Sequence, residues 1–268
     1  MIDITEKGAA LRAASEGRFN ELPVHNPDVE CCSRERIRAI QLEKLIAQVE
    51  WTYERVAWYR DQMDEMGVKP SDIKCLEDVR KLPFTDKHAL RKTFPYGMFA
   101  VPLDEVVELH SSSGTTGKPI VVGYNRHDMD VWNDCIMRLV QMAGVVPTDR
   151  VQMAFGYGMF TGGFGLHYGL QRLGCMMIPA GSGNTERQIQ MIQDYGTTVL
   201  VATLLTPCIS AKSARRWATT GRPPRYASVC SVESRALRVS RPKSNPDMHI
   251  VCTDNYGLTE VMGPGVSG

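Results

Sequence analysis

The stretch RVQMAFGYGMFTGGFGLHYGLQRLGCMMIPA, residues 150–180, decides the fold. It begins with a short apolar run, residues 150–155, that has the length and composition of a buried strand. Residues 165–174 read as a helix that ends at a glycine, and residues 175–180 form a second apolar run that ends near a proline. This order predicts a strand–helix–strand unit with its two strands parallel in one sheet.

The same alternation continues on both sides of this unit. Downstream, residues 185–196 read as a helix and residues 197–203 as a strand. Upstream, residues 105–110 and 119–124 read as strands around a polar loop, and residues 128–144 read as a helix that closes on Gly144. We therefore expect an α/β fold with a mostly parallel sheet flanked by helices. Ligands bind at the carboxyl ends of such strands, where residues 154–163 and 179–184 lie.

The first 103 residues predict a helical section. Apolar positions in residues 33–66 follow helical spacing, with Ser33 as the N-cap and Gly67 and Pro70 at the end. Residues 71–83 predict a short helix stopped by Pro83, and Thr85 is a candidate N-cap for another helix that ends near residue 92.

The overall composition is that of an ordinary globular protein. The chain has 268 residues, a net charge of +1, 43% hydrophobic and 23% charged residues. This balance does not favour nucleic acid or an anionic membrane as a partner. We expect no membrane span, since no apolar run approaches the roughly 20 residues needed. The first 21 residues lack an apolar signal core, and the eight cysteines are scattered, so we expect a cytoplasmic protein with reduced thiols.

Residues 204–246 differ from the rest of the chain. They contain nine of the 31 Lys and Arg residues but one acidic residue, Glu233, together with seven serines and five prolines. They show no sustained period of a helix or a strand. Such a composition is typical of a disordered basic segment, which could bind nucleic acid.

The polar loop in LHSSSGTTGKPIVVGYNRHD, residues 109–128, suits an anion. Glycine, serine and threonine allow consecutive backbone N–H groups and hydroxyls to turn toward one phosphate, and lysine adds charge. The loop is not a Walker A motif, because two residues separate Gly114 from Gly117 and Pro119 follows Lys118. An inert polar turn remains the alternative.

Two signatures occur in order along the chain. SSSGTTGKP, residues 111–119, resembles the nucleotide-binding signature of the adenylate-forming enzymes, and DNYGLTE, residues 254–260, resembles their second signature. The longer stretches at residues 82–124, 155–169 and 256–266 look like the phenylacetate–CoA ligase family. The resemblance covers about residues 24–203 and 247–268.

The resemblance implies a two-step reaction. ATP and an aryl acid such as phenylacetate give an acyl-adenylate, and coenzyme A then displaces AMP; Mg²⁺ assists. The implied catalytic residues are Lys118, Thr259 and Glu260. Tyr256 would stack on adenine beside Gly257, Thr259 would bind the α-phosphate, and Glu260 would bind Mg²⁺. The β- and γ-phosphates would lie on Ser112, Ser113, Gly114, Thr115, Thr116, Gly117 and Lys118.

The same resemblance places the aryl pocket after residue 155. Tyr157, Phe160 and Phe164 would line it, with neighbouring glycines, including Gly163, that let a ligand approach the backbone. Met159 is a further candidate. Core packing is the alternative for the aromatic side chains, and His167 either faces the site or has a structural role.

Two departures from the family pattern are visible. In residues 204–246 the family has a helix, a strand and a Gly-Ala-Glu-Pro run, whereas this segment has a foreign composition at about the right length. We hypothesise that it is translated out of frame. The sequence also stops at Gly268, before the ribose-binding acid and the mobile lid of the family, so we expect little or no ligase activity from these residues alone.

The expected organisation has four parts. Residues 1–103 are the helical section, 104–203 the nucleotide- and aryl-acid-binding core, 204–246 the basic segment, and 247–268 the second signature. A ligase for benzoate or another aryl acid, or a non-catalytic nucleotide-binding or interaction protein, remain the alternatives. Relatives suggest a homodimer.

Overall fold

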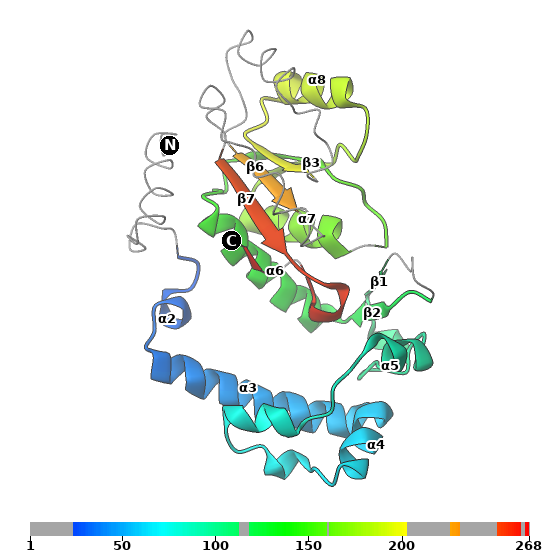
Figure 1. Cartoon of the computed structure of the whole chain (residues 1–268). Coiled ribbons are helices and arrows are strands. Elements are labelled where there is room, and N and C mark those ends of the chain that lie inside the picture. The colour runs from blue at the N-terminus through cyan, green and yellow to red at the C-terminus, as the bar shows by residue number, and fades with distance from the viewer. Residues whose placement is uncertain are drawn as a thin grey trace, which may run out of the picture. The chain divides into compact units, whose positions relative to one another are not determined.

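The computed structural model describes residues 24–112, 118–159, 161–202, 226–230, 251–263 and 266–267. The chain divides into two compact units, residues 26–129 and residues 1–25 with 130–268. Figure 1 labels the helices and strands of both. Each unit is treated by itself below.

The first unit begins with the helices α2 (Pro27–Glu30), α3 (Arg34–Arg55) and α4 (Ala57–Glu65). The expected cap is confirmed, since the Ser33 hydroxyl accepts a hydrogen bond from the Arg36 N–H at 3.2 Å. The expected single helix over residues 33–66 is wrong, because Val56 adopts an extended backbone (φ −112°, ψ 105°) between α3 and α4. Val56 is buried and β-branched, and β-branched residues favour an extended backbone over a helical one.

Short 3₁₀ turns replace the helix expected over residues 71–83. They are η2 (Pro70–Asp72) and η3 (Leu76–Lys81). The Asp72 carboxylate accepts from the Lys69 N–H, and the Asp78 carboxylate accepts from the N–H groups of Lys74 and Cys75. These side chains satisfy the backbone donors of tight turns in place of a longer helix.

The next helix, α5 (Lys87–Lys92), is capped by Asp86 rather than by Thr85. After η4 (Leu103–Glu105), the strands β1 (Glu108–Ser111) and β2 (Val121–Tyr124) form an antiparallel hairpin. Its register pairs Ser111 with Val121, so the residues of the polar loop connect two strands as expected.

The second unit is built on a six-stranded sheet. Its strands are β3 (Arg150–Ala154), β4 (Met176–Ile178), β5 (Val199–Ala202), β6 (Tyr226–Cys230), β7 (Val251–Tyr256) and β8 (Val266–Ser267), in the order β4-β3-β5-β6-β7-β8. The first five in this order are parallel, and β8 pairs antiparallel with β7. The predicted α/β fold with a mostly parallel sheet is confirmed.

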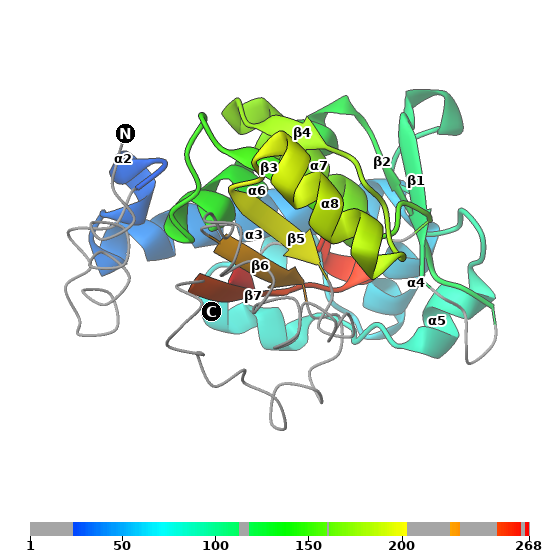
Figure 2. The ribbon, with the colours of Figure 1, turned by 90° about the horizontal axis from the view of Figure 1, so that it is seen from above.

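Helices cover both faces of this sheet. They are α6 (Arg126–Met142), which begins in the first unit, α7 (Thr161–Leu173) and α8 (Thr185–Tyr195). Figures 1 and 2 show α8 on one face and α6 and α7 on the other. On the α8 side, Ile189 and Ile192 pack against Ala154, Leu200 and Ala202. The intervening strand residues point to the opposite face and are also buried, as strand alternation requires.

The strand β6 was not predicted. It lies inside the basic segment 204–246 and pairs with β5 and β7. The expectation that this segment lacks a strand is therefore wrong for residues 226–230. Residues 203–225 and 231–250 lie outside the described residues.

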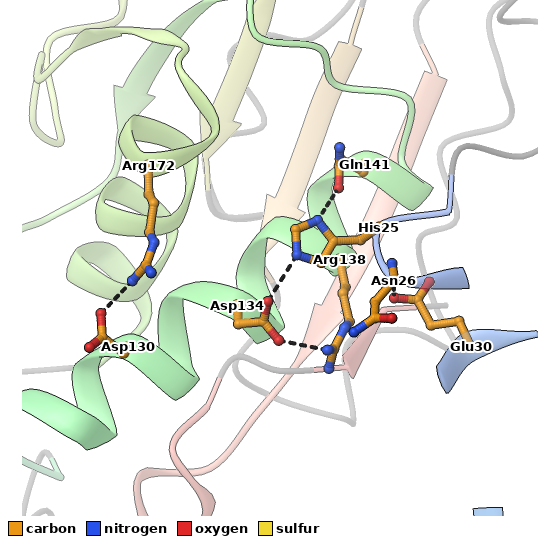
Figure 3. Close-up of polar contacts among 8 residues, drawn as sticks. All are labelled: His25, Asn26, Glu30, Asp130, Asp134, Arg138, Gln141 and Arg172. Atoms are coloured by element: carbon orange, nitrogen blue, oxygen red, sulfur yellow. Dashed lines mark hydrogen bonds and ion pairs between the residues drawn. The ribbon is translucent and has the colours of Figure 1, made fainter. Parts of the chain in front are cut away.

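Polar contacts on α6 complete the second unit (Figure 3). His25 Nδ1 lies 2.7 Å from Gln141 Oε1, and His25 Nε2 lies 2.9 Å from Asp134 Oδ1, which fastens residue 25 to this helix. Arg172 of α7 pairs with Asp130 of α6. No helix in the described part of the chain is both long and apolar enough to cross a membrane.

Candidate functional site

Three turns directly follow parallel strands, so all three lie at the edge of the sheet formed by the carboxyl ends of the strands. Residues 155–159 follow β3, residues 179–184 follow β4, and residues 257–263 follow β7. The strands β3 and β7 are separated by β5 and β6, so three strand spacings put their ends roughly 14 Å apart. A ligand that contacts both turns has to lie along this edge.

An aromatic cluster joins the turn after β3 to the helix α7; we define it as Tyr157 of the turn and Phe164, His167 and Tyr168 of the helix. The Tyr157 hydroxyl lies 2.8 Å from His167 Nδ1. The Tyr157 ring meets the Phe164 ring edge-on at 5.2 Å between centroids and the His167 ring at 5.6 Å. The predicted residues Tyr157 and Phe164 therefore lie together, and His167 joins them.

Burial keeps the polar members of this cluster neutral. It raises the pKa of the Tyr157 hydroxyl to about 12 and lowers the pKa of the His167 imidazole below its ordinary value. At neutral pH the tyrosine therefore keeps its proton, and the neutral imidazole has one N–H nitrogen and one nitrogen with a lone pair. The cluster combines two aromatic faces with one neutral hydrogen-bonded pair.

The glycines around this turn have different neighbours. A Cβ on Gly163 would lie 2.8 Å from the Gly156 carbonyl oxygen, and one on Gly165 would lie 2.2 Å from the Trp132 ring. Around Gly158, in contrast, nothing lies within 4 Å of such a Cβ. Gly158 therefore borders open space, and the expectation that a ligand approaches the backbone at these glycines stays a prediction. Gly163 and Gly165 instead allow α7 to pack closely against the Gly156 carbonyl and the Trp132 ring, respectively.

A buried polar network fixes the turn after β4. The Gln188 side-chain amide donates to the carbonyls of Gly181 and Gly183 at 2.8 and 3.3 Å. Gln152 donates to Gln188 Oε1 at 2.6 Å and accepts from the Thr197 hydroxyl at 2.9 Å. The sequence analysis missed this network, although a glutamine inside the apolar run RVQMAF was a signal for it.

The turn after β7 contains the second signature. The N–H groups of Val261 and Gly263 both donate to the Leu258 carbonyl, across η7 (Thr259–Val261). A Cβ on Gly263 would lie 2.5 Å from the Gly257 Cα, so the closed turn requires glycine there. Thr259 is buried and Glu260 is exposed. The Tyr256 backbone ends β7, and its side chain lies outside the described part.

The hairpin of the first unit carries the first signature. The Ser112 N–H donates to the Ile120 carbonyl, and the Ile120 N–H donates to Ser112 Oγ, both at 2.9 Å. These bonds close the base of the loop. Lys118 is exposed, with its ammonium 5.4 Å from the centroid of the Phe94 ring. The predicted residues Ser113, Gly114, Thr115, Thr116, Gly117 and Phe160 lie outside the described residues.

The described residues include no group of three or more His, Cys, Asp or Glu side chains able to hold a metal ion. Glu260 is a single exposed carboxylate. Mg²⁺ is often held by one or two carboxylates with substrate phosphates and water, so this residue suits that ion without a protein cage.

Comparison with known proteins gives a consistent result. No family model matches the chain. It is 41% identical to a phenylacetate-coenzyme A ligase of Pseudomonas putida over 89% of this chain and 54% of that protein. It is 40% identical to one of Thermus thermophilus and 39% identical to one of Escherichia coli, over 91% and 89% of this chain and 55% of each relative. The chain thus spans about half the length of the curated relatives it matches.

Solved structures agree on the fold. The chain superposes with a TM-score of 0.76 on 2-hydroxyisobutyryl-CoA ligase in an open conformation, at 22% identity and over 86% of this chain and 56% of that one. A postadenylation state of the same ligase gives a TM-score of 0.77, over 88% of this chain and 51% of that one. At this identity the likeness shows the adenylate-forming ligase fold.

Proposed function

The chain belongs to the phenylacetate–CoA ligase family, and we propose that it serves the ATP-dependent activation of an aryl acid, phenylacetate, for transfer to coenzyme A. The observation that carries the proposal is the arrangement of the sheet edge. The aromatic cluster follows β3 and the second signature follows β7, so an acyl group and a nucleotide can lie along one edge.

The aryl ring is proposed to bind against Tyr157 and Phe164, with Phe160 and Gly163 nearby. Tyr157 and Phe164 are half-buried rather than fully enclosed, so ring surface remains to contact a flat ligand. Edge-on contact between the two rings fixes their relative orientation. The open space at Gly158 supports a close approach to the backbone.

Nucleotide-binding roles are proposed for the residues of each signature, taken by itself. Ser112 to Lys118 would hold the β- and γ-phosphates, the Tyr256 ring would stack on adenine beside Gly257, and Thr259 would hydrogen-bond the α-phosphate. Lys118 is exposed and its ammonium therefore remains accessible to an anion. The Glu260 carboxylate would hold Mg²⁺, which neutralises phosphate charge as pyrophosphate leaves. Lys118, Thr259 and Glu260 are the proposed catalytic residues.

The remaining expectations stay predictions. They are the four-part organisation, the out-of-frame origin of residues 204–246, the homodimer and the cytoplasmic location. Translating the other two reading frames over codons 204–246 tests the out-of-frame hypothesis. If neither frame encodes an apolar periodic stretch with a Gly-Ala-Glu-Pro-like run, the frame hypothesis fails.

Binding measurements test the proposed function on the 268-residue chain. Calorimetric titration with phenylacetate and with ATP and Mg²⁺ should give saturable binding of both. Lys118→Ala should weaken ATP binding about tenfold or more, because it removes a charge-assisted contact. Lys74→Ala removes another exposed lysine of the same unit and is the matched control, which should leave ATP binding unchanged.

Two outcomes would contradict the proposal. Unchanged ATP affinity in Lys118→Ala would remove the phosphate role of the loop. Tighter binding of benzoate than of phenylacetate would leave the fold assignment unchanged but would make benzoate, rather than phenylacetate, the proposed substrate. ATP–pyrophosphate exchange dependent on phenylacetate would directly support adenylate formation.

A further inference from the structure

The segment that follows α5, residues 93–99, packs against the hairpin that carries the first signature. The Phe99 ring lies against Gly123 of β2, where a Cβ would come within 2.6 Å of the ring. Because Gly123 has no side chain, Phe99 lies directly on the strand. The Tyr96 ring meets the Phe99 ring at 5.3 Å between centroids. These contacts fix the segment relative to the two strands that the polar loop connects.

Phe94 begins this segment, and hydrogen bonds hold the backbone around it. The Thr93 hydroxyl donates to the Ala89 carbonyl at 2.9 Å, and the Gly97 N–H donates to the Thr93 carbonyl at 2.8 Å. The chain is therefore tied to α5 before Phe94 and across a tight turn after it. The Phe94 ring is half-buried, so part of its surface packs against the protein and part remains accessible.

Lys118 places its ammonium over this ring. Its Nζ lies 5.4 Å from the ring centroid, within the roughly 6 Å at which an aromatic face attracts a cation. The backbone of the lysine is tied as well, because the mutual hydrogen bonds of Ser112 and Ile120 close the loop two residues away. Both partners of the contact are therefore anchored within the same unit.

The contact leaves the ammonium able to bind an anion. The face of an aromatic ring attracts a cation through its quadrupole but carries no net charge, so the positive charge of Lys118 is not neutralised. An ammonium has three N–H donors, and the ring covers one side of the group. Since the side chain is exposed, the remaining donors are open to a phosphate. A carboxylate partner, in contrast, would have to be displaced first.

We propose that Phe94 is a positioning residue for Lys118: the Phe94 ring holds the lysine ammonium in place before the nucleotide binds. The inference rests on the proposed function, which assigns Lys118 to the phosphates. A lysine side chain has many rotamers, and a phosphate that binds it has to restrict them. The ring restricts them in the nucleotide-free chain, so less conformational entropy is lost on binding. Exposed cation–π contacts are weak, and the gain in affinity is accordingly a few-fold.

Calorimetric titration of the full 268-residue chain with ATP and Mg²⁺ tests the inference. Phe94→Leu should weaken ATP binding about threefold, because the ring face is lost. Phe94→Tyr keeps a ring face and should bind ATP as the parent chain does. Phe84→Leu is the matched control, since the Phe84 ring is 96% exposed and its removal should leave the affinity unchanged.

A double-variant cycle separates positioning of Lys118 from a general effect on the loop. Lys118→Ala removes the ammonium, so Phe94→Leu should cause no further loss of ATP affinity in that background. Additive losses would overturn the inference, because Phe94 would then act on the nucleotide without Lys118. Phe94→Met, which fills the same space flexibly and without a ring, repeats the measurements if Phe94→Leu lowers the stability of the chain.

A second readout does not depend on the nucleotide. In ¹H–¹³C spectra, the Lys118 Cε protons are assigned by the loss of their signal in Lys118→Ala. Their signal should move downfield in Phe94→Leu, because a ring current shifts protons above a ring face upfield, and Phe94→Tyr should keep the position of the parent.

The two readouts distinguish the inference from the proposed function. If no variant binds ATP, the proposed function fails and the spectra alone decide whether Phe94 holds Lys118. If the chain binds ATP but Phe94→Leu leaves the affinity unchanged, the inference is overturned. A Lys118 signal at the same position in the parent and in Phe94→Leu would overturn it as well.

Discussion

Glycines in two regions of the second unit perform different tasks. Those of α7, Gly163, Gly165 and Gly169, are in contact with other protein atoms wherever a Cβ would be added. Those of the turns at the sheet edge, Gly158 and Gly181, have nothing within 4 Å of an added Cβ. The first group allows close packing, whereas the second gives backbone freedom or open space. Substitutions in the two groups should therefore have very different effects.

The largest effect is expected for Gly165→Ala. The new Cβ would lie 2.2 Å from Trp132, a fully buried side chain that cannot move without disturbing the core. We expect a loss of about 3 kcal/mol in the free energy of unfolding, measured by chemical denaturation. Trp132→Leu should recover part of this loss in the double variant, since both changes affect one contact. Additive effects of the two changes would contradict the packing role.

The second largest loss of stability is expected when the buried hydrogen-bond network of Gln152 and Gln188 is broken. Gln188→Leu removes the side-chain acceptor of the buried Gln152, which keeps its bonds to the Gln188 carbonyl and the Thr197 hydroxyl. It also removes the donor to the carbonyls of Gly181 and Gly183. We expect a loss of about 2 kcal/mol in the free energy of unfolding. Amide hydrogen exchange at Gly181, whose N–H donates to the Met153 carbonyl, should accelerate. Gln190→Leu, on the exposed face of the same helix, is the matched control.

The fold was predictable from the sequence wherever apolar periodicity was strong. Strands β3, β4 and β5 and helices α7 and α8 lie where residues 150–203 predicted them, within a few residues. The strand β6 was missed because its segment is basic, rich in serine and proline, and without period. The break at Val56 was missed because neither glycine nor proline marks it; tertiary packing decides it.

The site was predictable only in part. The family resemblance groups Tyr157 with Phe164, and their rings are in contact. The sequence could not separate the glycines of residues 156–165, because their neighbours are set by the fold: Trp132 lies beside Gly165, and the Gly156 carbonyl lies beside Gly163. His167 had two open interpretations, and only the folded chain brings its Nδ1 to the Tyr157 hydroxyl.

A smaller effect is expected at Gly181, where conformation rather than space is limiting. Its φ is +74°, in the left-handed region, although an added Cβ would meet no neighbour. Gly181→Ala should cost about 1 kcal/mol in the free energy of unfolding. Gly181→Asn should cost less, because asparagine tolerates this region better. Equal costs for the two substitutions would show that conformation is not the limiting factor.

A pH-dependent effect should accompany the aromatic cluster. Burial lowers the pKa of His167 in the folded state, so the unfolded chain binds the proton first as the pH falls. Stability should therefore decrease below about pH 6.5 and level off below the folded-state pKa. The part of this decrease that is lost in His167→Asn measures the contribution of this residue.

The smallest effect on stability is expected for Gly158→Ala, and this variant separates the two groups of glycines most sharply. Nothing lies within 4 Å of the added Cβ, and Gly158 is not among the glycines with positive φ. The free energy of unfolding should change by less than about 0.5 kcal/mol. If the open space belongs to the aryl site, the same methyl group should nevertheless weaken phenylacetate binding, measured by calorimetry. Unchanged binding would show that the ligand does not approach Gly158, and would shift the proposed site toward the helix face of Phe164 and His167.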